Sequence, residues 1–298
     1  MRKLDNKGNV AIILCLVFTV LLGFTAYVVD IGLIYAEKVK LSNAIDSAVL
    51  AASLELPADD TKATNVAIDY LQKNNVDPNK VIITIGVDKK SIQMDGIKNV
   101  THFFAPIIGI NSSTINAGAK AIIAPIKSVT GGVRPFAVEE FPFSYGDVKI
   151  LKVGGGAGYH GNYGAVELGN HGGSSQFESN ALYGYSGTLT VGDKINTEPG
   201  NMSGATNRIN NYISSEYSDF YNFQRNSIRL WTMPLVKTNS LDGKGRYEVT
   251  IVGFAEFYVE AISTKENEIQ GRFVRYVTNG EIDINQSDNG FYGSKLVK

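Results

Sequence analysis

The apolar and polar positions of this chain predict one long N-terminal helix. Residues 10–29 read VAIILCLVFTVLLGFTAYVV, twenty residues without a charged side chain. At about 1.5 Å per residue, a helix of this length spans the roughly 30 Å hydrocarbon layer of a membrane. After Asp30, apolar residues recur at intervals of three and four as far as Leu54, and no proline occurs before Pro57. Because this spacing is typical of an amphipathic helix, we predict one continuous helix from about Val10 to Leu54.

The uncharged segment is expected to remain in the mature protein as a membrane anchor. A cleaved signal peptide usually has an apolar core of about 7–15 residues and ends at a small-x-small site. Residues 10–29 exceed that length, and the candidate cleavage residue Ala26 has the large Phe24 two positions before it. We therefore predict a single transmembrane helix over residues 10–29.

Charged residues on either side of this segment predict its orientation. Arg2, Lys3 and Lys7 precede the segment, whereas the first charge after it is the acidic Asp30. By the positive-inside rule, residues 1–9 form a cytoplasmic tail and the bulk of the chain lies outside the membrane. The predicted location is the cell membrane, so membrane lipid is the first expected partner.

The second half of the long helix is rich in small residues, and two interpretations of them stay open. They serve the core of the exported domain, or they let a helix of another protein approach closely. The small residues are Ser42, Ala44, Ser47, Ala48, Ala51, Ala52 and Ser53.

After this helix, the pattern predicts a small α/β unit that ends near Pro125. Asp59 and Asp60 precede an apolar-periodic segment and are suited to cap a helix. β-Branched runs then alternate with turn residues, which is typical of strands. The expected elements are a helix over 61–74, strands over 81–87, 91–95 and 113–124, and a short helix over 100–110 that ends at Gly109. Together with the long helix, this unit occupies residues 30–125.

The character of the sequence changes after residue 125. Residues 126–135 predict a linker, and residues 136–298 are rich in Gly and Tyr, with one helix expected over 205–215. Frequent turn signals among strong β-formers predict a mainly β domain, a sandwich or a barrel. The predicted fold class is α+β: an N-terminal transmembrane helix that continues into a long helix with a small α/β unit, followed by a mainly β C-terminal domain.

Composition and charge disfavour several functions. The 298 residues carry a net charge of −1, so no excess basic charge is available for nucleic acid. Hydrophobic residues make up 44% and charged residues 19%, which excludes a disordered chain. One Cys and three His provide little material for a metal centre or a catalytic triad. We predict no catalytic residue, no cofactor and no metal site, and hence no enzyme.

Two arrangements in the Gly-rich region resemble motifs but are better explained without a ligand. Residues 156–161 fit the pattern G-x-G-x-x-G, yet the chain that follows favours a strand, whereas a dinucleotide fold needs a helix there. His160 and His171 lie close by in sequence without the spacing of a zinc site or a nucleophile elbow. We interpret these residues as a glycine-rich β-turn and as loop-surface histidines.

A group of aromatic residues between positions 212 and 231 admits two interpretations. Their alternation with Ser and Asn is common in recognition surfaces. The same residues are suited to the core and rim of a β domain. The group consists of Tyr212, Tyr217, Phe220, Tyr221, Phe223 and Trp231.

The N-terminal segment resembles a known family, the TadE/TadG-like Flp pilus-assembly proteins. In that family, a Gly-initiated apolar span ends in Asp-x-Gly and is followed by a stretch similar to LQNAaDaAALAaA. Residues 7–56, KGNVAIILCLVFTVLLGFTAYVVDIGLIYAEKVKLSNAIDSAVLAASLEL, follow this pattern. The matching residues are Gly8, Asp30, Gly32, Leu41, Asn43, Ala44, Asp46, Ala48, Leu50, Ala51 and Ala52.

This resemblance implies a membrane-anchored component of a tight-adherence pilus. The long helix is then pilin-like, and its implied partners are pilin or pseudopilin subunits and pilus-assembly membrane proteins, with cell-wall or surface contact outside. Pilins cut by prepilin peptidase carry Glu at the fifth position after the cleaved Gly, whereas this chain has Ile13 there. The difference favours the TadG-like branch over the pilins proper.

Two functions of other classes remain open at this point. A membrane-tethered surface adhesin or glycan-binding module uses the same anchor with the β domain as its active end. A tethered extracytoplasmic hydrolase needs a converging nucleophile and base, and loss of activity on mutation of His160 or His171 would be its signature. Assembly or anchoring of a pilus is the function that we predict.

Overall fold

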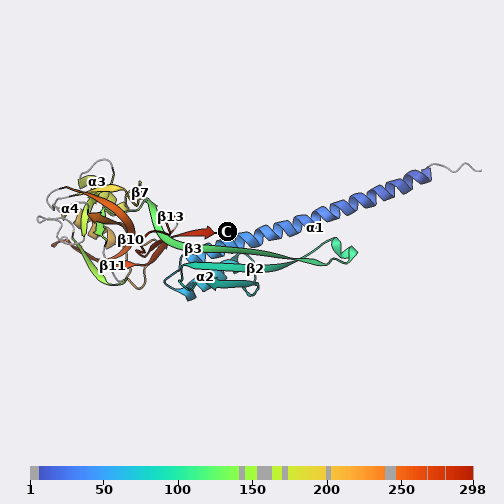
Figure 1. Cartoon of the computed structure of the whole chain (residues 1–298), viewed down its shortest axis with the longest axis horizontal. Helices are drawn as coiled ribbons and strands as arrows, with labels where there is room; N and C mark the ends of the chain where they lie inside the picture. Colours follow the sequence, from blue (N-terminus) through green and yellow to red (C-terminus); the bar gives the residue numbers. More distant parts are fainter. Residues whose placement is uncertain are drawn as a thin grey trace, which may run out of the picture. The chain divides into compact units, whose positions relative to one another are not determined.

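The helix α1 runs without interruption from Lys7 to Ser53 in the computed structural model (Figure 1). At about 1.5 Å per residue its 47 residues extend roughly 70 Å. The predicted continuous helix is therefore confirmed. Its N-terminal half is exposed, whereas its C-terminal half buries a stripe of apolar residues.

The structure describes residues 7–140, 145–152, 163–169, 174–198, 203–238, 246–266, 268–278 and 280–297. The chain divides into two compact units. Unit 1 consists of Met1–Ser53, Asp59–Ala121 and Leu296–Lys298, and unit 2 consists of Leu54–Ala58 and Ile122–Lys295.

In unit 1, the C-terminal half of α1 packs against α2 (Asp60–Lys73) and strand β2 (Ser91–Thr101). Helix α2 begins as predicted, because the Asp59 carboxylate accepts a 2.8 Å hydrogen bond from the Lys62 backbone N–H. A Cβ at Gly96 of β2 would lie 2.8 Å from the Cδ1 of Ile45 on α1, so the helix approaches the strand closely at this glycine.

The strands of unit 1 lie one beside the next. Strand β1 (Val81–Ile85) pairs antiparallel with β2, from Val81 opposite Gly96 to Ile85 opposite Ile92, and β2 neighbours β3 (Ser112–Thr130). Two short 3₁₀ helices complete the unit, η1 (Pro78–Lys80) and η2 (Ala105–Ile108). Helix η2 lies in the connection between β2 and β3 and has Gly109 as its C-cap, as the sequence predicts, whereas the predicted start at residue 100 is wrong because residues 100–101 continue β2.

Unit 2 contains a closed β-barrel. Five strands form a circuit, β10–β8–β6–β4–β9 and back to β10, in which each strand pairs with its two neighbours. Closure leaves no free edge in the circuit, which removes a route to aggregation. A mainly β C-terminal region, sandwich or barrel-like, is confirmed. The five strands are β4 (Phe136–Glu139), β6 (Tyr163–Glu167), β8 (Lys194–Thr197), β9 (Leu230–Thr238) and β10 (Glu248–Ser263).

Other elements extend or cover this barrel. Strands β11 (Glu268–Val274) and β5 (Val148–Lys152) continue the sheet beyond β10. Helices α3 (Ser174–Tyr183) and α4 (Ser203–Ile213) contribute Phe177, Ala181, Ile209 and Ile213 to the core around Trp231. The remaining strands of unit 2 are β7 (Thr188–Thr190), β12 (Tyr276–Thr278), β13 (Glu281–Ile282) and β14 (Phe291–Val297).

Some predicted boundaries are wrong. Residues 126–130, expected in a linker, continue strand β3, which pairs there with β7 and β13 and so belongs to both units. Strand β10 continues across Gly253 and Phe254, because its pairing with β9 shifts register between Ile251 and Gly253 without ending. Helix α3 was not predicted, since its mainly polar sequence lacks a clear apolar period.

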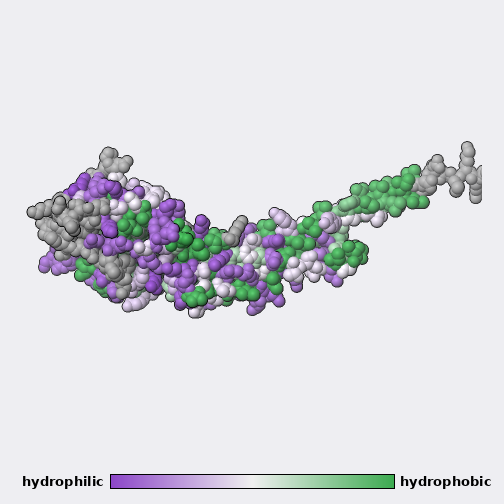
Figure 2. Space-filling model, viewed as in Figure 1, coloured by the Kyte–Doolittle hydropathy of each residue, from purple (hydrophilic) through white to green (hydrophobic). Residues whose placement is uncertain are grey.

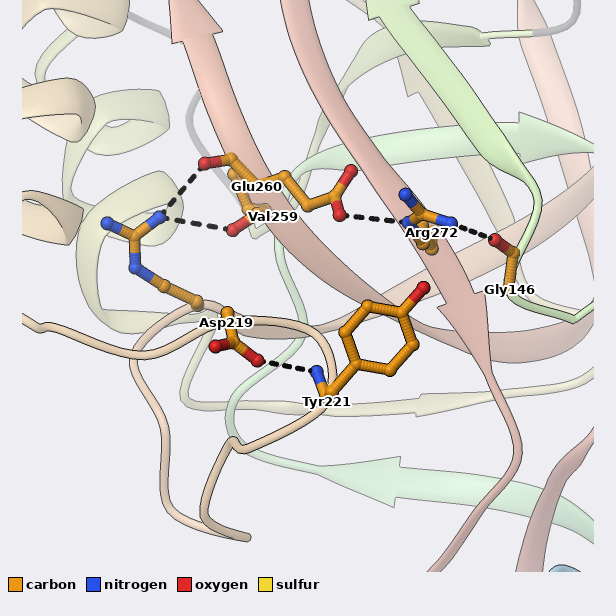
Figure 3. A network of polar contacts seen from close by, with 7 residues as sticks. Gly146, Asp219, Tyr221, Val259, Glu260 and Arg272 are labelled. Carbon is orange, nitrogen blue, oxygen red and sulfur yellow. Dashed lines mark hydrogen bonds and ion pairs between the residues drawn. The ribbon is translucent and has the colours of Figure 1, made fainter.

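A polar network holds the irregular segment 216–229 to the sheet of unit 2. Arg229 Nη1 donates to the carbonyls of Val259 and Glu260 on β10 at 3.3 and 3.2 Å. Arg272 on β11 donates from Nε to the Glu260 carboxylate and from Nη1 to the Gly146 carbonyl, both at 2.8 Å (Figure 3). The Arg229 bonds join the segment 216–229, which forms no helix or strand, to β10, and the Arg272 bonds join β11 to β10 and to Gly146.

Glu256 on β10 is a buried carboxyl inside unit 2. Its Oε2 accepts a 2.8 Å hydrogen bond from the Thr232 hydroxyl on the paired strand β9. Burial raises the pKa of Glu256 to about 8, and the Thr232 hydrogen bond and the positive charge of Arg134 offset this only in part. The carboxyl is therefore mainly protonated at neutral pH.

This pKa predicts a pH-dependent stability of unit 2. The pKa of Glu256 is about 8 when folded and near 4.5 when exposed, so the folded state binds an extra proton between these values. The free energy of unfolding is expected to fall as the pH rises through this interval, by at most about 1.4 kcal/mol per pH unit from this group. Glu256→Gln is expected to remove this pH dependence and, near pH 8, to have a larger free energy of unfolding than the wild type.

Urea unfolding at a series of pH values, followed through the fluorescence of the single tryptophan, Trp231, measures this effect. Trp231 is buried on β9 next to Thr232. Glu248→Gln, at an exposed position of β10, is the matched control and is expected to keep the wild-type dependence. An identical pH dependence in the wild type and in Glu256→Gln would contradict the prediction.

Candidate functional site

The N-terminal half of α1 presents a long apolar surface. Between Val10 and Val29 every residue except Ala26 is exposed. Within the described residues, α1 is the one helix that is long and apolar enough to cross a membrane. Soluble proteins rarely expose a continuous apolar surface of this size, whereas hydrocarbon solvates it well.

Asp30, the first charge after this surface, is buried. Its side chain is 5% exposed, because the connection between β2 and β3 covers it. Oδ1 accepts a 2.7 Å hydrogen bond from the Phe103 N–H, and Oδ2 accepts hydrogen bonds from Phe104 (3.1 Å) and Ala105 (2.7 Å). We call these hydrogen bonds the Asp30 clamp.

The clamp provides hydrogen-bond acceptors for backbone N–H groups that have none nearby in the sequence. The first N–H groups of a helical turn have no carbonyl partner within the turn and favour a negative charge. Phe103 and Phe104 directly precede η2 and Ala105 begins it, and the N-cap residue Phe104 provides no side-chain hydrogen bond. The Asp30 carboxylate satisfies these donors from α1, which fixes the loop to the helix at the end of the apolar surface.

His102 lies next to the clamp and is buried. Its Nε2 lies 2.9 Å from the Ser113 hydroxyl, and its backbone N–H donates to the Asn111 carbonyl at 3.1 Å. Nδ1 has no hydrogen-bond partner within the described part of the chain. His102 closes the base of the loop between β2 and β3, which agrees with a structural role.

A second polar contact joins α1 to β2. Glu37 accepts a 2.7 Å hydrogen bond from Lys98 on β2 at Oε2 and another from Lys40 at Oε1. The two ammonium groups lower the pKa of Glu37 to about 2, so the carboxylate is ionised at physiological pH. Two turns beyond Asp30, this contact sets the direction of β2 along α1.

The residues predicted from the family motif divide into two sets. Leu41, Ala44, Ala48 and Ala52 are buried in unit 1 by α2 and β2, so the small size of the three alanines serves the core of their own chain. Of the two interpretations of the small-residue stripe, packing in the core of the chain's own unit is the one observed for these three alanines. They are not available to a partner helix.

The second set remains accessible. Gly32 and Asn43 are exposed, and Asp46, Leu50 and Ala51 are half-buried. A Cβ built at Gly32 would meet nothing within 4 Å, so the backbone is open to close approach there. Gly8 lies in the first turn of α1.

Sequence reasoning missed the partners of Asp30 and Glu37. The clamp joins positions 73 to 75 residues apart, and its donors are backbone groups, which carry no sequence signal. One signal was present: residues 99–119 contain no Asp, Glu, Lys or Arg, a run that is unusual for an exposed loop.

The aromatic group of unit 2 belongs mostly to the core. Trp231 is buried and stacks on Phe136 at 5.3 Å between ring centroids, and Phe220 and Phe223 pack around Tyr258. Tyr217 and Tyr221 are instead exposed, by 101% and 86%. The core interpretation thus holds for part of the group, and two tyrosines face solvent.

The other candidate residues of unit 2 have limited structural description. His160, His171 and the glycines at 156–161 lie outside the described residues. Within the described ranges, three or more His, Cys, Asp or Glu residues never come together as a metal-binding group. The absence of catalytic, cofactor and metal sites therefore stays a prediction.

A single apolar helix of membrane-spanning length, continuous with the core helix of a folded unit, fits a membrane-anchored protein. Comparison with protein families supports this class: residues 8–60 match the family model described as "Putative Flp pilus-assembly TadE/G-like". The match covers α1 as far as the start of α2 and confirms the resemblance seen in the sequence. No curated protein and no solved structure matches the chain.

Loss of the Asp30 carboxylate is expected to release the loop between β2 and β3. Asp30→Ala leaves the N–H groups of Phe103, Phe104 and Ala105 without their acceptor, so their hydrogen exchange should accelerate, on the order of tenfold or more. Asp30→Asn keeps one acceptor oxygen and should give an intermediate rate. Hydrogen exchange of the full chain in micelles, read by mass spectrometry over residues 99–111, measures the change.

Asp46→Ala is the control, since it removes the other carboxylate of the family motif from the same helix. It should leave exchange over residues 99–111 unchanged. Wild-type exchange in Asp30→Ala would show that the clamp does not hold the loop.

Proposed function

We propose that this protein is a membrane-anchored, non-enzymatic component that assembles or anchors a pilus of the Flp, tight-adherence type. One observation carries the proposal: the segment that matches the pilus-assembly family coincides with α1, the apolar helix that continues into unit 1. The family motif thus lies on the element that would join the membrane to the exported part.

In this proposal α1 crosses the membrane with its N-terminus in the cytoplasm. Arg2, Lys3 and Lys7 precede the apolar surface and Asp30 follows it, which is the charge distribution of an N-in anchor. Unit 2 then lies outside and presents its barrel to the wall, to the pilus or to partner subunits. Ile13, in place of the Glu of processed pilins, favours an accessory TadG-like role over that of the major subunit.

The face of α1 that its own unit leaves open is the proposed contact with partner helices. Gly32, Tyr35, Val39 and Asn43 are exposed and recur at intervals of three and four, so they lie on one side of the helix. We call this surface the open face of α1. Exposed apolar side chains next to a glycine suit close helix–helix packing with a pilin, a pseudopilin or an assembly protein.

Site-specific photo-crosslinking tests this contact. A photoreactive amino acid at Asn43 is expected to capture a pilin, a pseudopilin or a pilus-assembly membrane protein in cells that make pili, as identified by mass spectrometry. The same amino acid at Asn65, an exposed asparagine on α2, is the matched control and should not capture that partner. Capture of nothing, or only of a second copy, from Asn43 would contradict the assembly role.

A tethered adhesin or glycan-binding module is the alternative, and the exposed Tyr217 and Tyr221 favour it, since tyrosine rings are frequent at recognition surfaces. The same experiment separates the two functions. If Asn43 captures no pilus protein while the full chain in nanodiscs binds glycan and loses that binding in Tyr221→Ala, the adhesin is the better account.

A further inference from the structure

The connection between β2 and β3 is apolar where it is most exposed. We call residues 102–111 the β2–β3 tip. Ile107 and Ile108 are 85% and 76% exposed, and Phe103, Phe104 and Ile110 are exposed as well. Figure 2 shows hydrophobic surface over the N-terminal half of α1 and again at this tip. Water is a poor solvent for five large apolar side chains on one short loop.

The Asp30 clamp sets the level of the tip along α1. Val29 is the last residue of the apolar surface, and Asp30 binds the first N–H groups of the tip. Helix η2 contacts α1, and Figure 1 shows the tip reaching along α1 toward its apolar half. If α1 crosses a bilayer, the tip lies where the helix leaves the hydrocarbon.

The polarity of the surrounding residues changes in the order expected at a membrane boundary. On both strands, the residues next to the apolar tip are exposed but uncharged: Asn99 and Thr101 on β2, before the tip, and Ser112 and Thr114 on β3, after it. The first charged residues beyond them are Lys98 and Lys120. On α1, the exposed Tyr27 lies one turn before Asp30, a position typical of aromatic residues at the interface.

The backbone of the tip is also prepared for a medium of low polarity. An N–H group without a partner is costly in lipid, so inserted loops need their donors satisfied. Asp30 accepts from Phe103, Phe104 and Ala105, and Pro106 has no N–H. Further N–H groups donate to carbonyls of the tip: His102 to Asn111, Ile107 to Phe104, Gly109 to Pro106 and Ile110 to Ala105.

We infer that the β2–β3 tip inserts into the lipid leaflet from which α1 emerges and forms a second membrane contact beside the transmembrane helix. Phe103, Phe104, Ile107, Ile108 and Ile110 enter the boundary between headgroups and hydrocarbon. Two attachment points, joined by the Asp30 clamp, restrict the tilt and rotation of unit 1 on the membrane. The inference rests on membrane insertion of α1 but not on any role in a pilus.

Spin labelling of the full chain in phosphatidylcholine–phosphatidylglycerol nanodiscs tests this insertion. A nitroxide is attached at Ile108→Cys in a Cys15→Ser background, and its collisions with oxygen and with a water-soluble nickel complex are compared. Oxygen concentrates in hydrocarbon and the nickel complex is excluded from it. Ile82→Cys is the matched control, because Ile82 is an isoleucine of β1 in the same unit and is 70% exposed.

The oxygen-to-nickel collision ratio is expected to be severalfold higher at Ile108 than at Ile82. An equal ratio at the two positions would place the tip in water and overturn the inference. Shielding of Ile108 from both reagents would show that protein covers the tip, which also overturns it. A nitroxide on the native Cys15 reports on α1: a high ratio there with a low ratio at Ile108 refutes tip insertion alone, and low ratios at both refute the anchor.

Discussion

The hydrogen bonds between the Asp30 carboxylate and the backbone N–H groups of residues 103–105 join helix α1 to the connection between β2 and β3. On one side lies a helix surface without charge, on the other a strand connection whose first donors have no partner of their own. A charged acceptor satisfies all three donors at once, and charged acceptors form the stronger hydrogen bonds. The place where the anchor ends and the folded unit begins is thereby fixed at one residue.

The packing of α1 in unit 1 also changes how the family motif is interpreted. A pattern of small residues on a membrane-proximal helix suggests contact with other helices, yet Ala44, Ala48 and Ala52 are used to pack α1 against α2 and β2. Asp30 serves the fold as well. The fold of unit 1 does not use Gly32 and Asn43, which are exposed. An assembly role would therefore depend on the open face of α1.

Much of unit 1 could be predicted from the sequence, because its determinants are local. The three-and-four spacing after Asp30 and the cap at Asp59 each act within a few turns. The continuous helix α1 and the start of helix α2 were therefore predicted correctly. The clamp was not, since it depends on backbone donors more than seventy residues away from the acceptor. Patterns of side chains carry little information on such contacts.

For unit 2 the sequence predicted a mainly β fold but did not decide between a sandwich and a closed barrel. Strand-forming segments and turns indicate a β domain, whereas the return of β9 to β10 depends on pairing between distant strands and on a register shift near Gly253. The buried Glu256 was likewise invisible in the sequence, where it is one acidic residue within a β-forming run. Only the fold shows that it faces Thr232 and Arg134.

We propose that α1 crosses the membrane once and emerges at Asp30. Single cysteines placed before, within and after the apolar segment in a Cys15→Ser background, and exposed in intact cells to a maleimide that cannot cross membranes, test it most directly. We expect no labelling at Val20 or Leu22, strong labelling at Lys38 of α1 and Asn65 of α2, which are exposed and lie outside the open face, and labelling at Lys3 only after lysis. Labelling of Lys3→Cys in intact cells, or protection of both Lys38→Cys and Asn65→Cys, would show that α1 does not cross the membrane in this way.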